Sequence, residues 1–239
     1  MIQAIVFDLD DTLYAQQEPF TQAIKKLFPT FPAEKMQALF IQFRYYSDLH
    51  YMKSISGEWS LEKMRHERIR LALEDFDFNA ATDDLTKFQA AYDEALNQIF
   101  LPTETREILT FLTQQKMPIA VITNGPVIRQ NQKINALQLQ KWIKPENMFI
   151  SDALQIQKPD PEIFHLMAEK LALPADTILY IGDSFENDVV GAKSAGWQVW
   201  WFNHQGRELP TGQSAIYDLE INSFPQLKEQ LLNEKKLQR

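Results

Sequence analysis

The chain contains no cysteine among its 239 residues. A disulfide framework and thiol chemistry are therefore excluded. No uncharged apolar run approaches the roughly 18 residues that a membrane-spanning helix needs, so we predict no such helix. The first apolar segment is followed at once by acidic residues, and for that reason we expect no signal peptide. Together these absences predict a cytoplasmic location.

Positive charge is also in deficit, with 24 Lys and Arg residues against 32 Asp and Glu residues and a net charge of −8. Such a surface repels phosphate backbones and anionic lipids, so we expect no nucleic-acid and no membrane partner. The segment 228–239 is locally basic, and we interpret it as a solvated tail. At 45% hydrophobic residues, the chain can form one large core or two modest ones. We expect a monomer or a homodimer.

An apolar segment near the N-terminus, residues 4–7, is followed by three carboxylates, Asp8, Asp10 and Asp11. A run of Ile, Val and Phe is typical of a buried parallel strand. In open α/β sheets the chemistry lies beyond the carboxyl ends of the strands. Because like charges raise one another's pKa, a hard divalent cation bound by oxygen atoms would explain the cluster. The alternative is a strand that ends in an acidic turn.

A second apolar segment, residues 118–122, ends in Thr123, Asn124 and Gly125. Backbone N–H groups at such a turn, together with the Thr123 hydroxyl, suit a phosphate oxygen. The same three residue types also form ordinary turns, so this segment alone does not decide between the two interpretations.

Two further segments carry charge. Lys158 lies in a turn that is stiffened by Pro159 and Pro161, although a solvated surface lysine is the commoner reading. A third apolar segment, residues 178–182, is followed by Asp183 and Asp188. These acids could equally mark the start of a helix. All the alternatives together would require three strand ends to carry complementary polar groups by chance.

Strand-like and helical patterns alternate outside residues 14–99, which predicts a Rossmann-like parallel sheet with helices on both faces. The expected strands lie near residues 3–7, 118–122, 147–150, 178–182 and 198–202. The expected helices lie near residues 103–116, 126–138, 160–171 and 186–195.

The segment 14–99 differs from the rest of the chain. Its apolar residues recur at helical spacing, as at Leu39, Phe40 and Phe43, and no segment within it is typical of a strand. We therefore predict an inserted all-helical domain of four or five helices. The expected domains are residues 1–14 with 100–239 and, inserted between them, residues 15–99.

Taken in order, four segments resemble the motifs of the haloacid dehalogenase (HAD) superfamily, on its phosphatase side. The segments are Asp8-Leu9-Asp10-Asp11-Thr12, Thr123-Asn124-Gly125, Lys158-Pro159 and Gly182-Asp183-Ser184-Phe185-Glu186-Asn187-Asp188. The first and last are the specific ones. The stretch with Gln130, Lys133 and Leu137 is similar to the helix that follows the second motif in members with a helical cap, and the resemblance weakens within the insertion itself.

The resemblance implies a role for each matching residue. Asp8 is the expected nucleophile, which forms an aspartyl-phosphate, and Asp10 the general acid and base. Thr123 and Asn124 are expected to bind the phosphoryl group, and Lys158 to neutralise its charge. The expected ligands of Mg²⁺ are the carboxylates of Asp8 and Asp183 and the backbone carbonyl of Asp10, with Asp188 in a more remote, supporting position.

Asp10 separates the chemistries of the superfamily. Members that resemble dehalogenases or phosphonatases lack a carboxylate at this position, so its presence favours hydrolysis or transfer of a phosphate ester. Two positions along an extended segment place Asp10 on the same face as Asp8. Asp11, at the adjacent position, should face away, and we expect it to be exposed or to cap the next element.

The insertion resembles the cap that closes over the active site in one class of the superfamily, and we expect it to select the substrate. Aromatic and basic residues are the candidates for contacts with the leaving group: Tyr14, Tyr45, Tyr46, His50, Tyr51, Trp59, Arg65 and Arg68. Such a mixture suits a sugar ring or a nucleotide base, and nucleotidases of the superfamily share the helical cap.

The sequence therefore predicts a Mg²⁺-dependent phosphatase that acts on a small phosphorylated metabolite. A phosphoglucomutase-like phosphoryl transferase and a haloacid dehalogenase are the enzymatic alternatives. A non-catalytic binding protein on the same scaffold is a further alternative, although such a protein should have lost at least one motif residue and none is missing.

Overall fold

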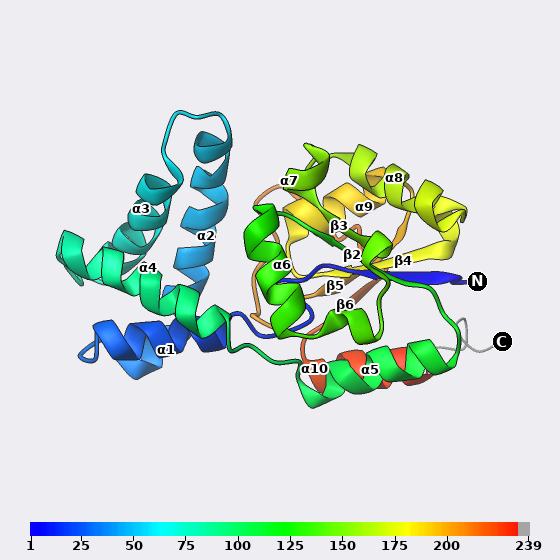
Figure 1. Cartoon of the computed structure of the whole chain (residues 1–239), viewed down its shortest axis with the longest axis horizontal. Coiled ribbons are helices and arrows are strands. Elements are labelled where there is room, and N and C mark those ends of the chain that lie inside the picture. Colours follow the sequence, from blue (N-terminus) through cyan, green and yellow to red (C-terminus); the bar gives the residue numbers. More distant parts are fainter. Residues whose placement is uncertain (234–239) are drawn as a thin grey trace. The chain divides into compact units, whose positions relative to one another are not determined.

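The computed structural model describes residues 1–233 and divides into two compact units. One unit comprises Met1–Ala15 together with the chain from Phe100 onward, and the other comprises Gln16–Ile99. The second unit is thus an insertion, because the chain leaves the first unit once and returns to it once (Figure 1). Residues 234–239 of the basic C-terminal segment lie outside the described part of the chain.

The first unit is built on a six-stranded parallel sheet in the order β3-β2-β1-β4-β5-β6. β1 is therefore a central strand, with β2 on one side and β4 on the other. In chain order, the strands are β1 (Ala4–Phe7), β2 (Ile119–Thr123), β3 (Met148–Ile150), β4 (Ile178–Gly182), β5 (Gln198–Phe202) and β6 (Leu219–Ile221).

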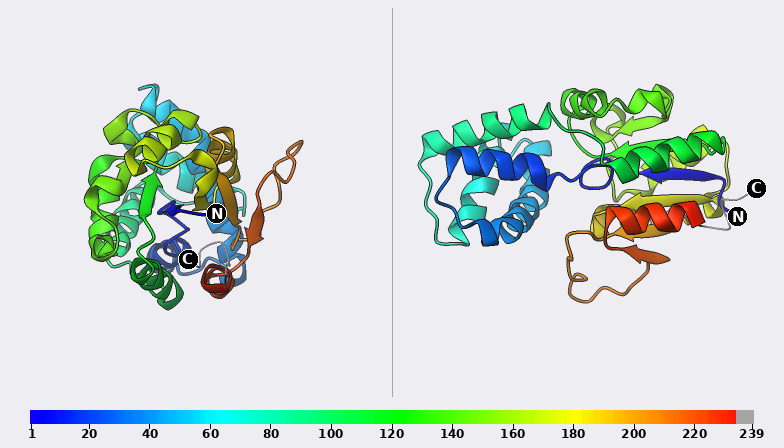
Figure 2. Two further views of the ribbon diagram at one scale, coloured as in Figure 1. Left: turned by 90° about the vertical axis from the view of Figure 1, so that its right-hand side faces the viewer. Right: turned by 90° about the horizontal axis from the view of Figure 1, so that it is seen from below.

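Helices cover both faces of this sheet. Helices α5 (Thr103–Gln114) and α10 (Phe224–Asn233) lie side by side on one face, as Figures 1 and 2 show. Helices α8 (Pro161–Leu171) and α9 (Gly191–Ser194) pack on the other face, where Phe164 and Trp197 enclose a core with strand residues such as Tyr180. The remaining helices are α6 (Val127–Ala136) and the short α7 (Ser151–Leu154).

The inserted unit contains four α-helices and no strand within Gln16–Ile99. They are α1 (Gln17–Leu27), α2 (Met36–Ile55), α3 (Leu61–Glu74) and α4 (Thr82–Leu96), with a 3₁₀ turn at Ala33–Lys35. The Ser60 side chain caps α3 by accepting a hydrogen bond from the Lys63 N–H. Fully buried aromatic rings hold the bundle together, and Phe20 contacts Phe40, Phe43 and Phe88.

The predicted fold class, a parallel α/β sheet with helices on both faces plus an all-helical insertion, is confirmed. The prediction missed β6, α10 and the short α7. The expected helix at 186–195 consists of a π-helical turn, Phe185–Val190, followed by α9. Lys228 of the basic segment lies in α10, with its Nζ atom 2.5 Å from Glu107. Among the described residues, no helix is both long and apolar enough to cross a membrane.

Candidate active site

Three adjacent strands bring the predicted site residues to one edge of the sheet. Asp8 follows β1, Thr123 ends β2 and Asp183 follows β4, and the parallel order places all three strand ends at the same edge. The backbone N–H of Asp8 donates to the Ile181 carbonyl at 2.9 Å, which extends the β1–β4 ladder up to the site.

Lys158 lies at the centre of a buried charge network. Its Nζ atom is 2.6 Å from Asp8 Oδ1, 2.6 Å from Asp188 Oδ1 and 2.9 Å from the Tyr180 hydroxyl. Burial alone would lower the pKa of Lys158, but Asp188 and Asp8 outweigh this effect and raise it. The side chain is therefore a permanent cation beside two carboxylates, and the surface-lysine reading is wrong.

The turn that carries Lys158 is tied to the end of β2. The Lys158 N–H donates to Asn124 Oδ1 at 3.0 Å, and Asn124 Nδ2 donates to the Lys158 carbonyl at 2.9 Å. Asp160 then caps α8 by accepting from the Glu162 N–H at 3.0 Å. The Asn124 side chain thus positions Lys158. The backbone N–H of Asn124 is therefore the group with which Asn124 could bind a phosphoryl oxygen.

Carboxylates outnumber cations around Asp8. Oxygen atoms of Asp8, Asp183 and Asp188, all buried, lie within 4.8 Å of one another. Burial raises the pKa of Asp8 well above its usual value; Lys158 opposes this rise, whereas Asp188, Asp183 and Asp10 add to it. A hard divalent cation with a preference for a few carboxylate oxygens fits this donor set.

Asp10 is held by three side chains. Tyr14 donates its hydroxyl to Oδ1, whereas Gln130 Nε2 at 3.1 Å and Lys133 Nζ at 2.5 Å approach Oδ2. Gln130 and Lys133 are three residues apart on α6, and therefore lie on one face of that helix. Both are buried, so α6 presents two polar side chains to the first motif.

Asp11 differs from its prediction. It is fully buried, with a φ of 60°, and is neither exposed nor a simple cap. His204 Nε2 lies 3.2 Å from its Oδ1, and Arg207 reaches from Asp11 to Asp183, with Arg207 Nη1 3.1 Å from Asp183 Oδ2. The loop after β5 therefore neutralises Asp11. Burial alone would lower the pKa of His204, but its hydrogen bond to Asp11 and the charge of that carboxylate together outweigh burial and raise it.

The sequence pattern of the haloacid dehalogenase-like hydrolase family matches residues 2–196. The chain belongs to the haloacid dehalogenase-like hydrolases. This family assignment confirms the resemblance found in the four motifs, and it establishes the chain as a hydrolase of the HAD fold.

Relatives of this HAD hydrolase differ in activity. A glyceraldehyde 3-phosphate phosphatase from Pyrococcus furiosus is 31% identical, over 54% of this chain, and the match spans about half of that protein (53%). The pyrimidine 5'-nucleotidase YjjG from Escherichia coli is 25% identical over 95% of this chain and 96% of its own length. An (S)-2-haloacid dehalogenase from Pseudomonas putida is 26% identical over 94% of this chain and 92% of its own length.

Solved structures show the same fold. The HAD-hydrolase YfnB from Bacillus subtilis, in a crystal structure bound to magnesium, has a TM-score of 0.69 at 21% identity. The comparison covers 96% of this chain and 98% of that one. Both the sheet and the helical insertion therefore belong to a known HAD architecture.

The candidates for leaving-group contacts occupy different environments. Tyr14 is buried against Asp10, and Arg68 donates to Ser47 and Gln89 within the bundle. Burial lowers the pKa of Arg68 to about 10. His50 is buried between aromatic rings, whereas Tyr45 is more than half exposed. The remaining candidates, Tyr46, Tyr51, Trp59 and Arg65, are partly exposed.

Sequence reasoning gave no role to several groups that build this HAD site. Tyr180 was hidden in an apolar strand, and its contact with Lys158 depends on two segments that only the fold brings together. Gln130 and Lys133 were noted only as similar to a family helix. Their spacing of three residues places both side chains on one face of an amphipathic helix, and this spacing was the sequence feature that could have indicated a shared role.

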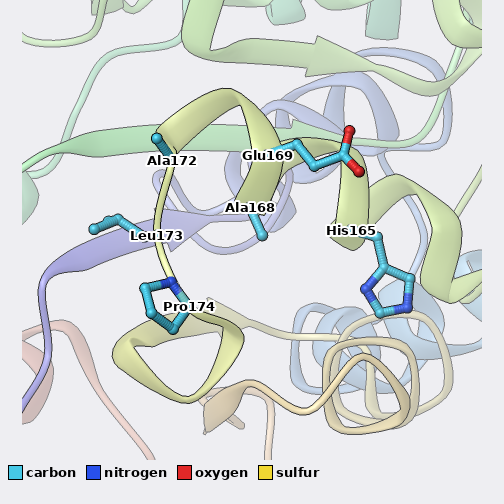
Figure 3. A pocket seen from close by; sticks show the side chains of 6 residues that line it. All are labelled: His165, Ala168, Glu169, Ala172, Leu173 and Pro174. Carbon is cyan, nitrogen blue, oxygen red and sulfur yellow. The ribbon is translucent and has the colours of Figure 1, made fainter.

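An open hollow of about 540 Å³ lies elsewhere on the HAD core (Figure 3). It is lined by residues of α8 and of the following turn, such as His165, Glu169 and Pro174. This turn precedes β4, whereas Asp183 follows it, so the hollow lies toward the opposite edge of the sheet. None of its lining residues belongs to the four motifs.

Proposed function

We propose that this protein is a Mg²⁺-dependent phosphatase that hydrolyses a small phosphomonoester through an aspartyl-phosphate. The observation that carries the proposal is the pairing of Asp8 with Lys158 in the presence of a second carboxylate, Asp10, two positions away. Attack on a phosphate dianion needs a nucleophile close to positive charge, and departure of an alkoxide needs a proton donor. This site contains both.

Asp8 attacks phosphorus with one carboxylate oxygen, and the bond from phosphorus to the leaving oxygen breaks. Asp10 gives its proton to that oxygen and so becomes a carboxylate. It then removes a proton from the water that attacks the phosphorus of the aspartyl-phosphate, and inorganic phosphate and Asp8 are released.

Positive charge and hydrogen-bond donors hold the phosphoryl group. The Lys158 ammonium, 2.6 Å from Asp8, neutralises charge that develops during the transfer. The Thr123 hydroxyl and the Asn124 backbone N–H at the end of β2 bind phosphoryl oxygens. Hydrogen bonds from the Lys158 Nζ atom to the Tyr180 hydroxyl and to Asp188 hold the ammonium group in place.

Asp8, Asp183 and the backbone carbonyl of Asp10 would hold Mg²⁺, with Asp188 in support. When bound, the ion neutralises the phosphate dianion against the surrounding carboxylates. Arg207, 3.1 Å from Asp183, fixes the orientation of that carboxylate.

The inserted helical unit, residues 16–99, is the proposed cap, and it selects the leaving group. Relatives that act on sugar phosphates and on nucleotides support a small phosphorylated metabolite as the substrate. The similarity to haloacid dehalogenases is the main argument for another activity. Asp10 argues against it, because displacement of a halide needs no proton donor.

A panel of phosphorylated metabolites, with p-nitrophenyl phosphate as a general substrate, tests the proposal. We expect Mg²⁺-dependent release of phosphate, and loss of turnover in Asp8→Asn at unchanged circular dichroism, because an amide cannot attack phosphorus. Asp176→Asn, at an exposed position, is the matched control. Release of chloride from 2-chloropropionate without phosphatase activity would instead establish the dehalogenase. Transfer of phosphate between sugar positions would establish the mutase.

Dependence on metal is measured on the same enzyme. Exhaustive chelation with EDTA should abolish turnover and added Mg²⁺ should restore it. Ca²⁺ should restore little, because its larger and looser coordination shell disturbs the geometry of in-line transfer. Full activity after chelation would contradict the assignment of the acidic cluster to a metal.

A further inference from the structure

Lys133 and Gln130 form a buried polar pair on α6 for which the four motifs provide no explanation. The Lys133 side chain is 6% exposed, and its Nζ atom lies 2.5 Å from Asp10 Oδ2 and 2.8 Å from Gln130 Oε1. Burial of an ammonium is unfavourable unless it is paired. Here the partner is the carboxylate that the proposed mechanism uses for proton transfer.

We propose that Lys133 is a positioning residue that sets the geometry of two catalytic groups, Asp10 directly and Thr123 through Gln130. The inference rests on the proposed phosphatase function. It assigns to α6 a task distinct from that of the four motifs, which supply the groups that react.

The direct effect of Lys133 concerns the Asp10 carboxylate. Lys133 and Gln130 both bind Oδ2, and Tyr14 binds Oδ1 from the other side. A proton donor must lie within hydrogen-bond reach of the leaving oxygen, and small misplacements have large effects on rate. A charged hydrogen bond from a rigid helix restricts the carboxylate more strongly than contact with solvent would.

The indirect effect depends on the orientation of the Gln130 amide. A lysine ammonium can only donate, so it must face the carbonyl oxygen of Gln130. The amide nitrogen is thereby turned toward Asp10 and Thr123, and it donates to the Thr123 hydroxyl oxygen. Because Thr123 accepts this bond, its own hydrogen remains free to donate to a phosphoryl oxygen.

The two effects predict different kinetic signatures. Loss of Asp10 geometry should affect substrates whose leaving groups need a proton more than it affects p-nitrophenyl phosphate, whose leaving group departs without one. Loss of the Thr123 orientation should weaken the binding of inorganic phosphate. A residue that only stabilised the fold would change neither of these quantities, because both are independent of the concentration of folded enzyme.

The test compares Lys133→Met with Lys133→Arg and with Lys141→Met, a matched control at an exposed lysine that follows α6. The measured quantity is the ratio of kcat/KM for p-nitrophenyl phosphate to kcat/KM for an alkyl phosphate that the wild type hydrolyses. We expect Lys133→Met to raise this ratio at least about tenfold, which is a partial loss of the roughly 10²–10⁴-fold that general acid catalysis contributes. Lys133→Arg should restore part of the difference, and Lys141→Met should leave the ratio unchanged.

A second arm measures the inhibition constant of inorganic phosphate in Gln130→Met, with Gln132→Met on the exposed side of α6 as its control. We expect roughly tenfold weaker inhibition in Gln130→Met, as for the loss of one charged hydrogen bond. If the wild type hydrolyses phosphate esters but both variants keep its ratio and its inhibition constant, the positioning role is wrong. If the wild type hydrolyses none, the proposed function itself has failed.

Discussion

Individual residues at this site are held by more than one constraint. Asp188 is an example, because Oδ1 accepts from Lys158 and from the Tyr180 hydroxyl while Oδ2 accepts from the Ser184 N–H at 2.9 Å. Gly182 lies directly beneath this carboxylate, and a Cβ atom added there would lie 2.4 Å from Asp188 Cγ. The absence of a side chain at position 182 is therefore a requirement of the charge network.

Gly182→Ala should displace Asp188 and with it Lys158. We expect a loss of roughly 1–3 kcal/mol in the free energy of unfolding, as for other overpacked sites, together with a fall in turnover. Denaturant unfolding and phosphatase assays measure the two effects. In a double-mutant cycle, Gly182→Ala should cost less stability when Asp188 is already Ala. Equal costs in both backgrounds would show that the two residues do not conflict.

At the scale of elements, the strands were predicted best. A short continuous apolar run bounded by turn residues is typical of a buried strand, and β1, β2, β3, β4 and β5 each lie within one residue of their predicted ranges. β6 was missed because its three residues, Leu219–Ile221, are only partly apolar and follow a long loop. The π-helical turn Phe185–Val190 was read as ordinary helix, since its periodicity over six residues does not differ visibly from 3.6.

The site shows the same division between local and long-range information. The strand ends and their carboxylates could be read from the chain, because parallel strands place their carboxyl ends at one edge. The burial of Asp11 by His204 could not, because the two residues are separated by most of the sequence. The role of Asn124 as the partner of the Lys158 backbone was missed because the two residues lie in different segments, 34 positions apart, that only the fold brings together.

Helix α2 contains a titratable group that links stability to pH. His50 is buried between Tyr46 and Trp59, and burial, followed by the charge of Lys53, lowers its pKa, against a smaller opposing effect of Glu67. Unfolding returns the imidazole to a pKa of about 6.5. As the pH falls through this range, the unfolded chain binds more protons at this position than the folded chain does, so stability should fall as the pH falls.

The change that tests this linkage is His50→Phe, with His66→Gln on α3 as the matched control. Thermal unfolding is followed at pH 8 and at pH 5.5. We expect the loss of stability on acidification to be smaller in His50→Phe than in the wild type, while His66→Gln behaves like the wild type. The same acid-induced loss in all three proteins would remove His50 from this role.

For the whole molecule, the main question is how a general phosphoryl site acquires a preferred substrate. In the proposed mechanism the core motifs contact only the phosphoryl group and the metal, so discrimination has to come from what surrounds the leaving group. The insertion offers a stripe of apolar side chains along α2, Tyr45, Leu49 and Met52, all of them more than half exposed. Arg68, by contrast, donates hydrogen bonds to Ser47 and Gln89 within the helical bundle.

These environments predict different results for substitutions in the insertion. Tyr45→Ala should change the relative kcat/KM among natural phosphates more than it changes turnover of p-nitrophenyl phosphate. Arg68→Met should mainly lower the melting temperature, because it removes two side-chain hydrogen bonds within the helical bundle. Lys87→Ala, at an exposed position on α4, is the control. An unchanged substrate ranking in a scan of the whole stripe would shift the selection of substrate to core loops such as 203–214.

The central position of β1 has a consequence for synthesis of the chain on the ribosome. Ile5 pairs with Ile119 and Phe7 with Ile181, so the first strand made has neither neighbour until about a hundred further residues have emerged. The helices at residues 17–96, whose contacts are made within one continuous stretch, are complete before β2 exists. Local contacts form sooner than distant ones. The inserted bundle should therefore fold first, while β1, the strand that leads to Asp8, stays unpaired until the rest of its sheet has been made.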